Sequence, residues 1–242
     1  MKTSFDRAAK TYDENAIVQA LSSDYLAGLC SKLVRSVDPP PITVLDAGCG
    51  TGLTSLALRR FFPSIDITLC DISERMIAAA EAKIGNCKCI VHDMETYEFE
   101  DHYDLVISNL AMQWLEDFEA FLEKVMQRCE YLAFSVPTHE SFLDYKRLFS
   151  ESGIDILAIE CMVQEAVIDA AMRHGTLVCS HHRSYSLHFS KALFAAKHFK
   201  NIGAGTPRQQ RMQSKISAVL ASAKEEICLN YEVLFVILKR AA

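Results

Sequence analysis

Long apolar runs and paired cysteine motifs are both missing from this chain. No apolar stretch approaches the roughly 20 residues that cross a membrane, and the first residues show no signal-peptide pattern. The nine cysteines are scattered without CxxC spacing, so neither a disulfide framework nor a zinc site is indicated, and we expect no metal. These absences favour a soluble, cytoplasmic protein that does not act on a membrane.

Acidic residues are missing from one long segment. Residues 170–224 contain nine Lys or Arg and no Asp or Glu, although the 242-residue chain has a net charge of −6. Charge segregation of this kind indicates an anionic partner that is attracted to one face. A solvated surface segment with no partner would have the same composition.

A glycine-rich stretch over residues 43–52 has the sequence TVLDAGCGTG. It predicts a buried strand, a tight turn through Gly48, Cys49 and Gly50, and an amphipathic helix over residues 53–62. Glycines let the backbone approach a ligand closely at the start of a helix. We therefore expect a nucleotide-like ligand at this turn.

Two residues beside the turn indicate which nucleotide binds there. A dinucleotide fingerprint needs a third glycine at the position where this chain has Leu53. Asp46, at the end of the strand, would repel a pyrophosphate and attract a cation. S-adenosylmethionine carries both an ammonium and a sulfonium, so the charge of Asp46 favours this cofactor.

Three further apolar strands each end in an acid or an amide: Asp71, Asp93 and Asn109. Asp71 is predicted to accept hydrogen bonds from both ribose hydroxyls. Asp93 is predicted to accept from the adenine amine, with Ile72 and Met94 against the faces of the ring. Each residue alone could be a helix cap or a turn residue, but four such strand ends in order favour a binding site.

The hydrophobic pattern predicts a single α/β domain over residues 1–242. We expect a Rossmann-like, seven-stranded, mostly parallel sheet with helices on both faces, an antiparallel last strand and a small helical cap. A lid helix is expected over residues 1–38 and a cap insertion over about 138–205, and Trp114 is predicted to act mainly in packing. The strands are predicted near residues 43–46, 65–70, 89–94, 103–108, 131–136, 176–186 and 231–238.

With these features in place, residues 44–136 resemble the class I methyltransferases that use S-adenosylmethionine. A narrower resemblance covers most of the chain. The segments FDRAAKTYD (5–13), SNLAMQW (108–114) and 193–204, together with Gln19, are similar to the malonyl-acyl-carrier-protein O-methyltransferases. Enzymes of that family act at the start of biotin synthesis, where they methylate the free carboxylate of a malonyl thioester.

This resemblance implies roles for several residues. Tyr12 closes over the cofactor, and the turn at residues 202–204 borders the substrate pocket. We expect Arg7 and Tyr12 to bind the cofactor. Tyr12 and Gln113 are the catalytic candidates: Tyr12 is expected to shape the methyl-transfer pocket, and Gln113 or Asn109 to orient nearby groups. A carboxylate is already ionised at pH 7, so the reaction needs alignment and exclusion of water rather than a strong base.

The implied partner is acyl carrier protein, a small acidic helical protein with a phosphopantetheine arm. The acid-free segment matches this partner in charge. Arg183 is a candidate for holding the thioester or the malonyl group, and malonyl-CoA stays open as an alternative acyl carrier. The candidates for contact with the carrier protein are Lys197, Lys200, Arg208 and Arg211.

Three other functions stay open at this point. A methyltransferase for a small acid of the aconitate type would need no docking face for a protein. An RNA methyltransferase would use the basic segment for phosphate contacts, but the acidic total charge and the lack of a recognisable RNA-binding module argue against nucleic acid. A non-catalytic adaptor would bind no S-adenosylmethionine.

Overall fold

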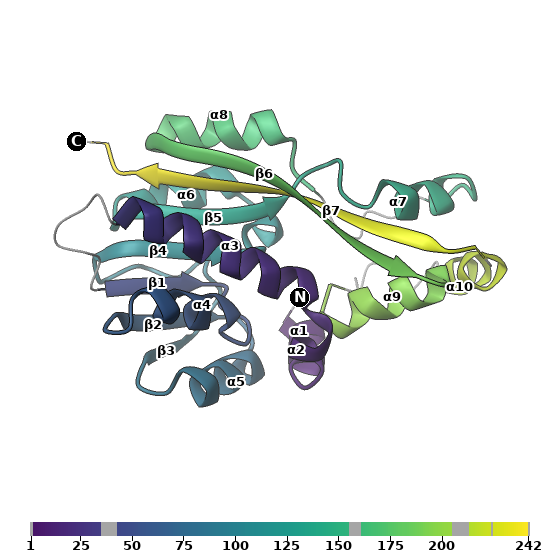
Figure 1. The fold of residues 1–242 in the computed structure, drawn as a ribbon, viewed down its shortest axis with the longest axis horizontal. Coiled ribbons are helices and arrows are strands. Elements are labelled where there is room, and N and C mark those ends of the chain that lie inside the picture. Colours follow the sequence, from purple (N-terminus) through teal and green to yellow (C-terminus); the bar gives the residue numbers. More distant parts are fainter. Residues whose placement is uncertain (1, 35–42, 155–160, 205–212, 224, 242) are drawn as a thin grey trace.

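The computed structural model describes residues 2–34, 43–154, 161–204, 213–223 and 225–241 (Figure 1). Within these residues, seven strands form one sheet. The strands are β1 (Thr43–Ala47), β2 (Asp66–Asp71), β3 (Lys88–Val91), β4 (Tyr103–Asn109), β5 (Cys129–Pro137), β6 (Thr176–Phe189) and β7 (Ile227–Lys239). Their order across the sheet is β3-β2-β1-β4-β5-β7-β6.

The first five strands are parallel, and β7 runs antiparallel to both β5 and β6. This arrangement confirms the predicted seven-stranded Rossmann-like sheet with an antiparallel last strand. Buried parallel strands are apolar on both faces, and β4 shows why: Leu105 and Ile107 pack in one core while Val106 packs in the other. The carboxyl ends of the parallel strands therefore meet along one edge, where a ligand site can form.

Helices cover both faces of the sheet (Figure 1). One core contains residues of α3, α4 and α5, and the second contains residues of α6 and α8. Ser73 caps α5 by accepting from the Met76 amide at 3.2 Å, and Asp117 caps α6 in the same way through the Ala120 amide. These helices are α3 (Ile17–Val34), α4 (Leu53–Phe61), α5 (Glu74–Ile84), α6 (Phe118–Met126) and α8 (Gln164–His174).

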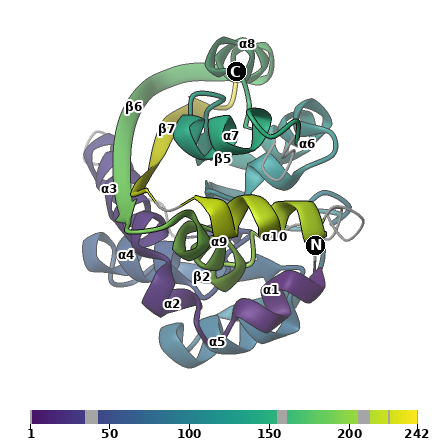
Figure 2. The same ribbon diagram turned by 90° about the vertical axis from the view of Figure 1, so that its right-hand side faces the viewer.

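Most of the remaining helices gather at the end of the molecule that faces the viewer in Figure 2, where the labels of α1, α2, α7, α9 and α10 lie. The predicted lid region contains two short helices before α3. The predicted insertion at 138–205 contributes the strand β6 to the sheet and also contains the helices α7, α8 and α9. The remaining helices are α1 (Lys2–Ala8), α2 (Tyr12–Asn15), η1 (Met112–Trp114), α7 (Leu143–Ser150), α9 (Ala192–Asn201) and α10 (Gln213–Ser222).

The long β6–β7 pair extends the sheet toward this helical end (Figure 1). β7 pairs with β5 only from Val233 onward, whereas its pairing with β6 begins at Ile227. The first half of β7 therefore lies beyond β5 and close to α9. Among the described residues, no helix combines the length and apolar character needed to span a bilayer.

Candidate functional site

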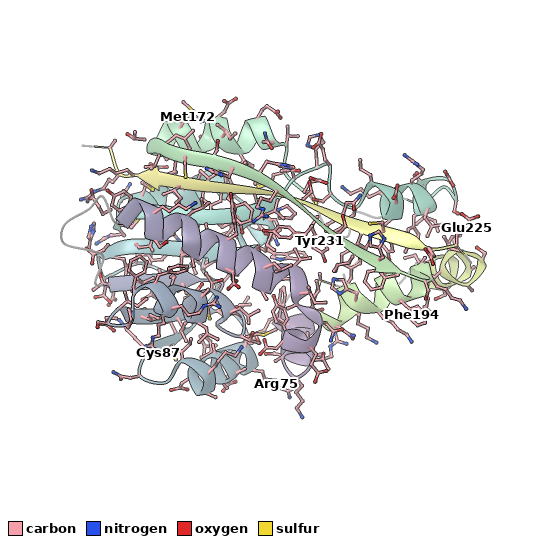
Figure 3. The ribbon with its side chains drawn as sticks, viewed as in Figure 1. Arg75, Cys87, Met172, Phe194, Glu225 and Tyr231 are labelled. Atoms are coloured by element: carbon pink, nitrogen blue, oxygen red, sulfur yellow. The ribbon has the colours of Figure 1, made fainter. Side chains whose placement is uncertain are left out.

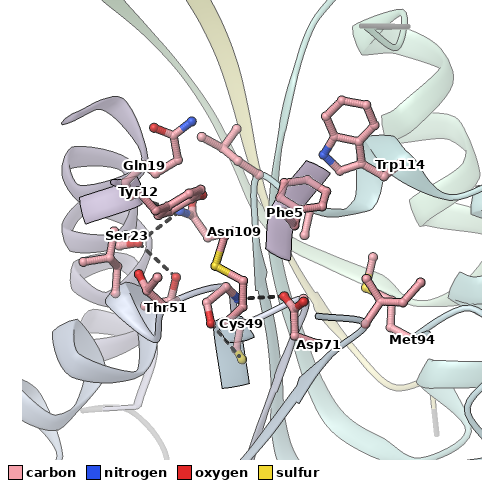
Figure 4. Close-up of a pocket in the computed structure, with 18 of the residues that line it drawn as sticks. Phe5, Tyr12, Gln19, Ser23, Cys49, Thr51, Asp71, Met94, Asn109 and Trp114 are labelled. Atoms are coloured by element: carbon pink, nitrogen blue, oxygen red, sulfur yellow. Dashed lines mark hydrogen bonds between the residues drawn. The ribbon is translucent and has the colours of Figure 1, made fainter. Parts of the chain in front are cut away.

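A deep cleft lies at the carboxyl ends of β1, β2 and β4, where the strand order changes direction on either side of β1. It encloses about 890 Å³, including the open solvent at its mouth. Figure 4 shows Tyr12 and Gln19 on one side, Phe5 and Trp114 on the other, and Asp71 below them. The predicted site residues that line the cleft are Tyr12, Gly48, Cys49, Gly50, Asp71, Ile72, Asp93, Met94 and Asn109.

The glycine turn is shaped by close backbone approach. Gly48 has a φ of +72°, and a Cβ atom there would lie 2.5 Å from the Cβ of Ala111. The amides of Gly48 and Cys49 both donate to the Cys70 carbonyl, at 2.8 and 3.0 Å, and the Gly50 amide donates to Asp71 Oδ2. Because these donors are already used within the protein, they do not form a phosphate cradle.

Asp71 connects the turn to the start of α5. Its Oδ2 accepts from the Gly50 amide at 2.9 Å, and its Oδ1 accepts from the Ser73 amide at 2.8 Å. Burial raises the pKa of this carboxyl, and the two amides act in the opposite direction. Each oxygen has a further lone pair, so the carboxylate can still accept from a ligand in the cleft.

Asp46 lies elsewhere than the sequence suggests. The charge argument puts it beside a cationic ligand, but it is 1% exposed and is not among the residues that line the cleft. Its Oδ2 accepts from the Ser55 hydroxyl at 2.6 Å and from the Ser55 amide at 3.1 Å. Burial raises the pKa of Asp46 to about 7. Its visible contact is with the first turn of α4.

Arg7 also lies away from the cleft. It is exposed on α1, and its Nε donates to the Thr3 carbonyl at 3.0 Å. Phe5 is the residue of α1 that faces the site, with its ring packed edge-on against Trp114 at a centroid distance of 6.0 Å. Trp114 packs against the core as predicted and also forms a wall of the cleft.

A second, smaller chamber of about 420 Å³ adjoins the cleft, and both are lined by Tyr12, Gln19 and Trp114. Among the described residues that line this chamber, none has a formally charged side chain. Gln113 lines only the second chamber, where its Nε2 donates to the Leu110 carbonyl at 2.7 Å. The Oε1 atoms of Gln19 and Gln113 are buried without a hydrogen-bond partner in the described structure. The chamber is therefore polar at a few points and apolar elsewhere.

Two residues of this chamber have strained backbones. Leu110 has a φ of 50° and Phe142 a φ of 62°, and they are the non-glycine residues with positive φ in the described part of the chain. Residues other than glycine rarely adopt a positive φ, and those that do are often found at functional sites. Leu110 is held by its amide, which donates to the Ser135 carbonyl and hydroxyl.

Tyr12 and Asn109 occupy the border between helix and cleft. Burial and the nearby carboxylates of Asp71 and Asp13 raise the pKa of the Tyr12 phenol, so it stays protonated at neutral pH. The Asn109 amide donates to the Gln19 carbonyl at 3.1 Å and to the Ser23 hydroxyl at 3.0 Å. Asn109 therefore fixes α3 against the end of β4.

The predicted cationic residues that the structure describes do not line the two cavities. Arg183 lies on β6 with its guanidinium carbon 4.4 Å from the centre of the Tyr25 ring. Lys197 and Lys200 are exposed on α9. Arg208 and Arg211 lie outside the described residues.

Several residues that line the cavities carry no recognisable motif in the sequence. Phe5, Gln19 and Trp114 belong to segments on which the family resemblance rests, so the resemblance is the signal that could identify them. Others become visible only when the chain is folded, because their elements are distant in sequence. These include Ser23, Met76, Leu115, Phe142 and Tyr231.

Comparison with known proteins gives consistent results. A family model described as a methyltransferase domain matches residues 44–130. Relatives named malonyl-[acyl-carrier protein] O-methyltransferase include one from Ilyobacter polytropus, 33% identical over 60% of this chain and 55% of its own length. Another, from Herminiimonas arsenicoxydans, is 29% identical over 98% of this chain and 94% of its own. The chain spans little more than half the length of the Ilyobacter polytropus relative and of a Bacillus cereus relative with the same name.

Solved structures show the same fold. The YcgJ protein of Bacillus subtilis has a TM-score of 0.60 and 14% identity, covering 90% of this chain and 99% of that one. Magnesium protoporphyrin IX methyltransferase of Synechocystis, solved with bound S-adenosylhomocysteine (SAH), has a TM-score of 0.59 and 15% identity, covering 90% and 83%. At these identities the likeness establishes the fold alone.

Proposed function

Because this chain has the class I methyltransferase fold and carries a methyltransferase domain, we propose that it is an enzyme that methylates malonyl-acyl carrier protein. The methyl donor is S-adenosylmethionine, and the acceptor is the free carboxylate of the malonyl thioester. The product, a malonyl methyl ester, starts biotin synthesis. The observation that carries the proposal is an uncharged chamber that adjoins an acid-lined cleft at the end of the parallel strands.

The cleft suits the cofactor in its chemistry. Its charged lining residues are the acids Asp71 and Asp93, with no Lys or Arg among the described residues that line it. Such a lining suits a cationic nucleoside and disfavours a pyrophosphate. Asp71 would accept from the ribose hydroxyls and Asp93 from the adenine amine, with Ile72 and Met94 against the ring. The bound cofactor supplies an electrophilic methyl group on a sulfonium.

The N-terminal helices would act as the lid of this single domain. Asp6 of α1 accepts from the Ser73 hydroxyl at 2.6 Å. Asp13 of α2 accepts from the Thr51 hydroxyl and pairs with the Lys83 ammonium at 2.7 Å. These contacts tie α1 to the N-cap of α5, and α2 to the glycine turn before α4 and to the end of α5, and so hold Tyr12 over the cleft.

The second chamber would receive the acceptor group. Tyr12 lines both cavities, and we assign to it the role of aligning the carboxylate with the methyl group. The aromatic rings of Phe5 and Trp114 exclude water from the same border. Since the carboxylate is already ionised at pH 7, alignment and dryness suffice without a general base.

The outer surface of α9 suits an acidic carrier protein. It exposes Leu193 and Phe194, at 42% and 43%, beside Lys197 and Lys200. The Lys197 ammonium lies 5.6 Å from the centre of the Phe194 ring, and Figure 3 shows Phe194 on the outer side of this helix. Exposed apolar side chains flanked by lysines match a partner with an acidic helix. Arg208 and Arg211 remain part of this proposal.

The test is a methyl-transfer assay with labelled S-adenosylmethionine and parallel acceptors. We expect label on malonyl-acyl carrier protein, a weaker signal or none on malonyl-CoA, and none on aconitate, free malonate or bulk RNA. Label confined to a free acid would favour a small-acid methyltransferase, and label on RNA would favour an RNA methyltransferase. Failure to bind S-adenosylmethionine would favour a non-catalytic adaptor.

A further inference from the structure

Two residues distant in sequence form a buried pair beside the second chamber. Tyr231 of β7 lines the chamber and is 4% exposed, and His198 of α9 is 6% exposed. His198 Nε2 lies 2.9 Å from the Tyr231 hydroxyl. The hydroxyl is thus held by a side chain of α9, the helix that exposes Lys197 and Lys200 on its outer surface. Figure 3 places Tyr231 at the middle of the molecule.

Both members of the pair are uncharged at neutral pH. Burial lowers the pKa of His198 to about 4, so its ring carries one N–H and one free lone pair. Burial raises the pKa of Tyr231, and the nearby Tyr12 phenol raises it further. When Nε2 carries the ring proton, it donates to the phenolic oxygen, and the phenolic hydrogen is then free to point at a ligand.

The chamber needs donors of this kind if it receives a carboxylate. Within the part of the chain that the structure describes, no lining residue of the chamber is cationic. Gln113 donates one of its two amide hydrogens to the Leu110 carbonyl, and its Oε1 is an acceptor without a partner among the described residues. Among the described residues that line the chamber, the side chains that can donate are the phenols of Tyr12 and Tyr231, the amides of Gln19 and Gln113 and the indole of Trp114. Neutral donors hold an anion without placing a second positive charge near a sulfonium.

We propose that Tyr231 donates a hydrogen bond to the acceptor carboxylate and that His198 is the positioning residue that orients the phenol. This inference rests on the proposed function. One carboxylate oxygen accepts from Tyr231, and the other forms the new bond to the methyl carbon while the bond from that carbon to sulfur breaks. The electron pair of the broken bond stays on sulfur, which becomes a neutral thioether. The ester formed is neutral and a weaker acceptor, so the same hydrogen bond favours substrate over product.

The test compares Tyr231→Phe with the control Tyr185→Phe. Tyr185 lies opposite Tyr231 in the β6–β7 register, and its buried hydroxyl has no hydrogen-bond partner among the described residues. Loss of a hydrogen bond to a charged group lowers kcat/KM for malonyl-acyl carrier protein by about 10- to 100-fold in Tyr231→Phe. Tyr185→Phe retains wild-type turnover, and both variants bind SAH as the wild type does.

The positioning role has its own readout. His198→Leu is expected to match Tyr231→Phe in kcat/KM, whereas His198→Gln restores part of the loss because its amide can donate to the phenol. Thermal unfolding with SAH present identifies any variant that fails to fold.

A folded Tyr231→Phe variant with kcat/KM within twofold of the wild type overturns the inference and leaves the proposed function standing. A wild-type chain that binds SAH but methylates no malonyl thioester overturns the proposed function, and the inference with it.

Discussion

At the scale of single residues, Asp71 connects the backbone of the site with its ligand chemistry. Its carboxylate holds the Gly50 amide of the glycine turn and the Ser73 amide at the start of α5. These two hydrogen bonds within the protein hold the turn in shape, so the turn does not depend on a ligand that binds the two amides. A carboxylate with both oxygens already oriented is well prepared to accept from a pair of neighbouring hydroxyls.

Replacement of Asp71 tests this role. We expect Asp71→Ala to weaken cofactor binding by about 1–3 kcal/mol, because the ribose hydroxyls and both amides lose their acceptor. Asp71→Asn keeps one acceptor oxygen and should lose less. Isothermal titration with SAH measures the change, and Asp66→Ala, an exposed residue at the other end of β2, is the matched control. Equal affinities in folded Asp71→Ala and wild type would remove Asp71 from the ribose role.

At the scale of elements, α9 presents two different faces. Its inner face buries His198 and Phe199, and its outer face exposes Phe194, Lys197 and Lys200. Residues three or four positions apart share one face of a helix, so the sequence spacing separates the two sets. Docking on the outer face would thus occur on the same helix that positions Tyr231.

Charge reversal on the outer face tests the docking role. The double variant Lys197→Glu/Lys200→Glu should raise KM for malonyl-acyl carrier protein roughly tenfold, because two favourable charge contacts become repulsive. The KM for malonyl-CoA, if it is a substrate, and the affinity for SAH should stay near their wild-type values. Lys32→Glu, exposed at the end of α3, is the control. Equal KM values for the carrier protein in variant and wild type would show that it docks elsewhere.

At the scale of the whole molecule, the sheet was predictable and the second chamber was not. The first four predicted strands have local signals: an apolar run, then an acid, amide or glycine at or just after the end of the strand. The chamber combines Phe5, Gln19, Phe142, Ile202 and Tyr231, which come from five separate parts of the chain. No local sequence pattern predicts that these residues line one chamber, because long-range packing brings them together.

The position of Asp46 shows a related limit of sequence reasoning. The residue type at a strand end predicts charge near the turn, but not which side of the strand end the carboxylate faces. Here the Ser55 hydroxyl and amide at the first turn of α4 provide its hydrogen bonds. Only the folded helix shows that these donors are within reach.

The buried carboxyl of Asp46 should affect stability across the whole fold. Burial raises its pKa from the usual 3.8 to about 7. Between these values the folded chain holds a proton that the unfolded chain has released, so this residue makes the free energy of unfolding fall as pH rises. Asp46→Asn removes this dependence, at most about 1.4 kcal/mol per pH unit. Urea unfolding at several pH values in this window measures it, and parallel curves for variant and wild type would contradict the burial effect.

The measurement that tests the central claim most directly is the intact mass of malonyl-acyl carrier protein after incubation with the enzyme and S-adenosylmethionine. The account predicts a gain of one methyl group on the acyl arm. An unchanged mass, from a chain that binds SAH, would contradict methylation of malonyl-acyl carrier protein while leaving the methyltransferase fold intact.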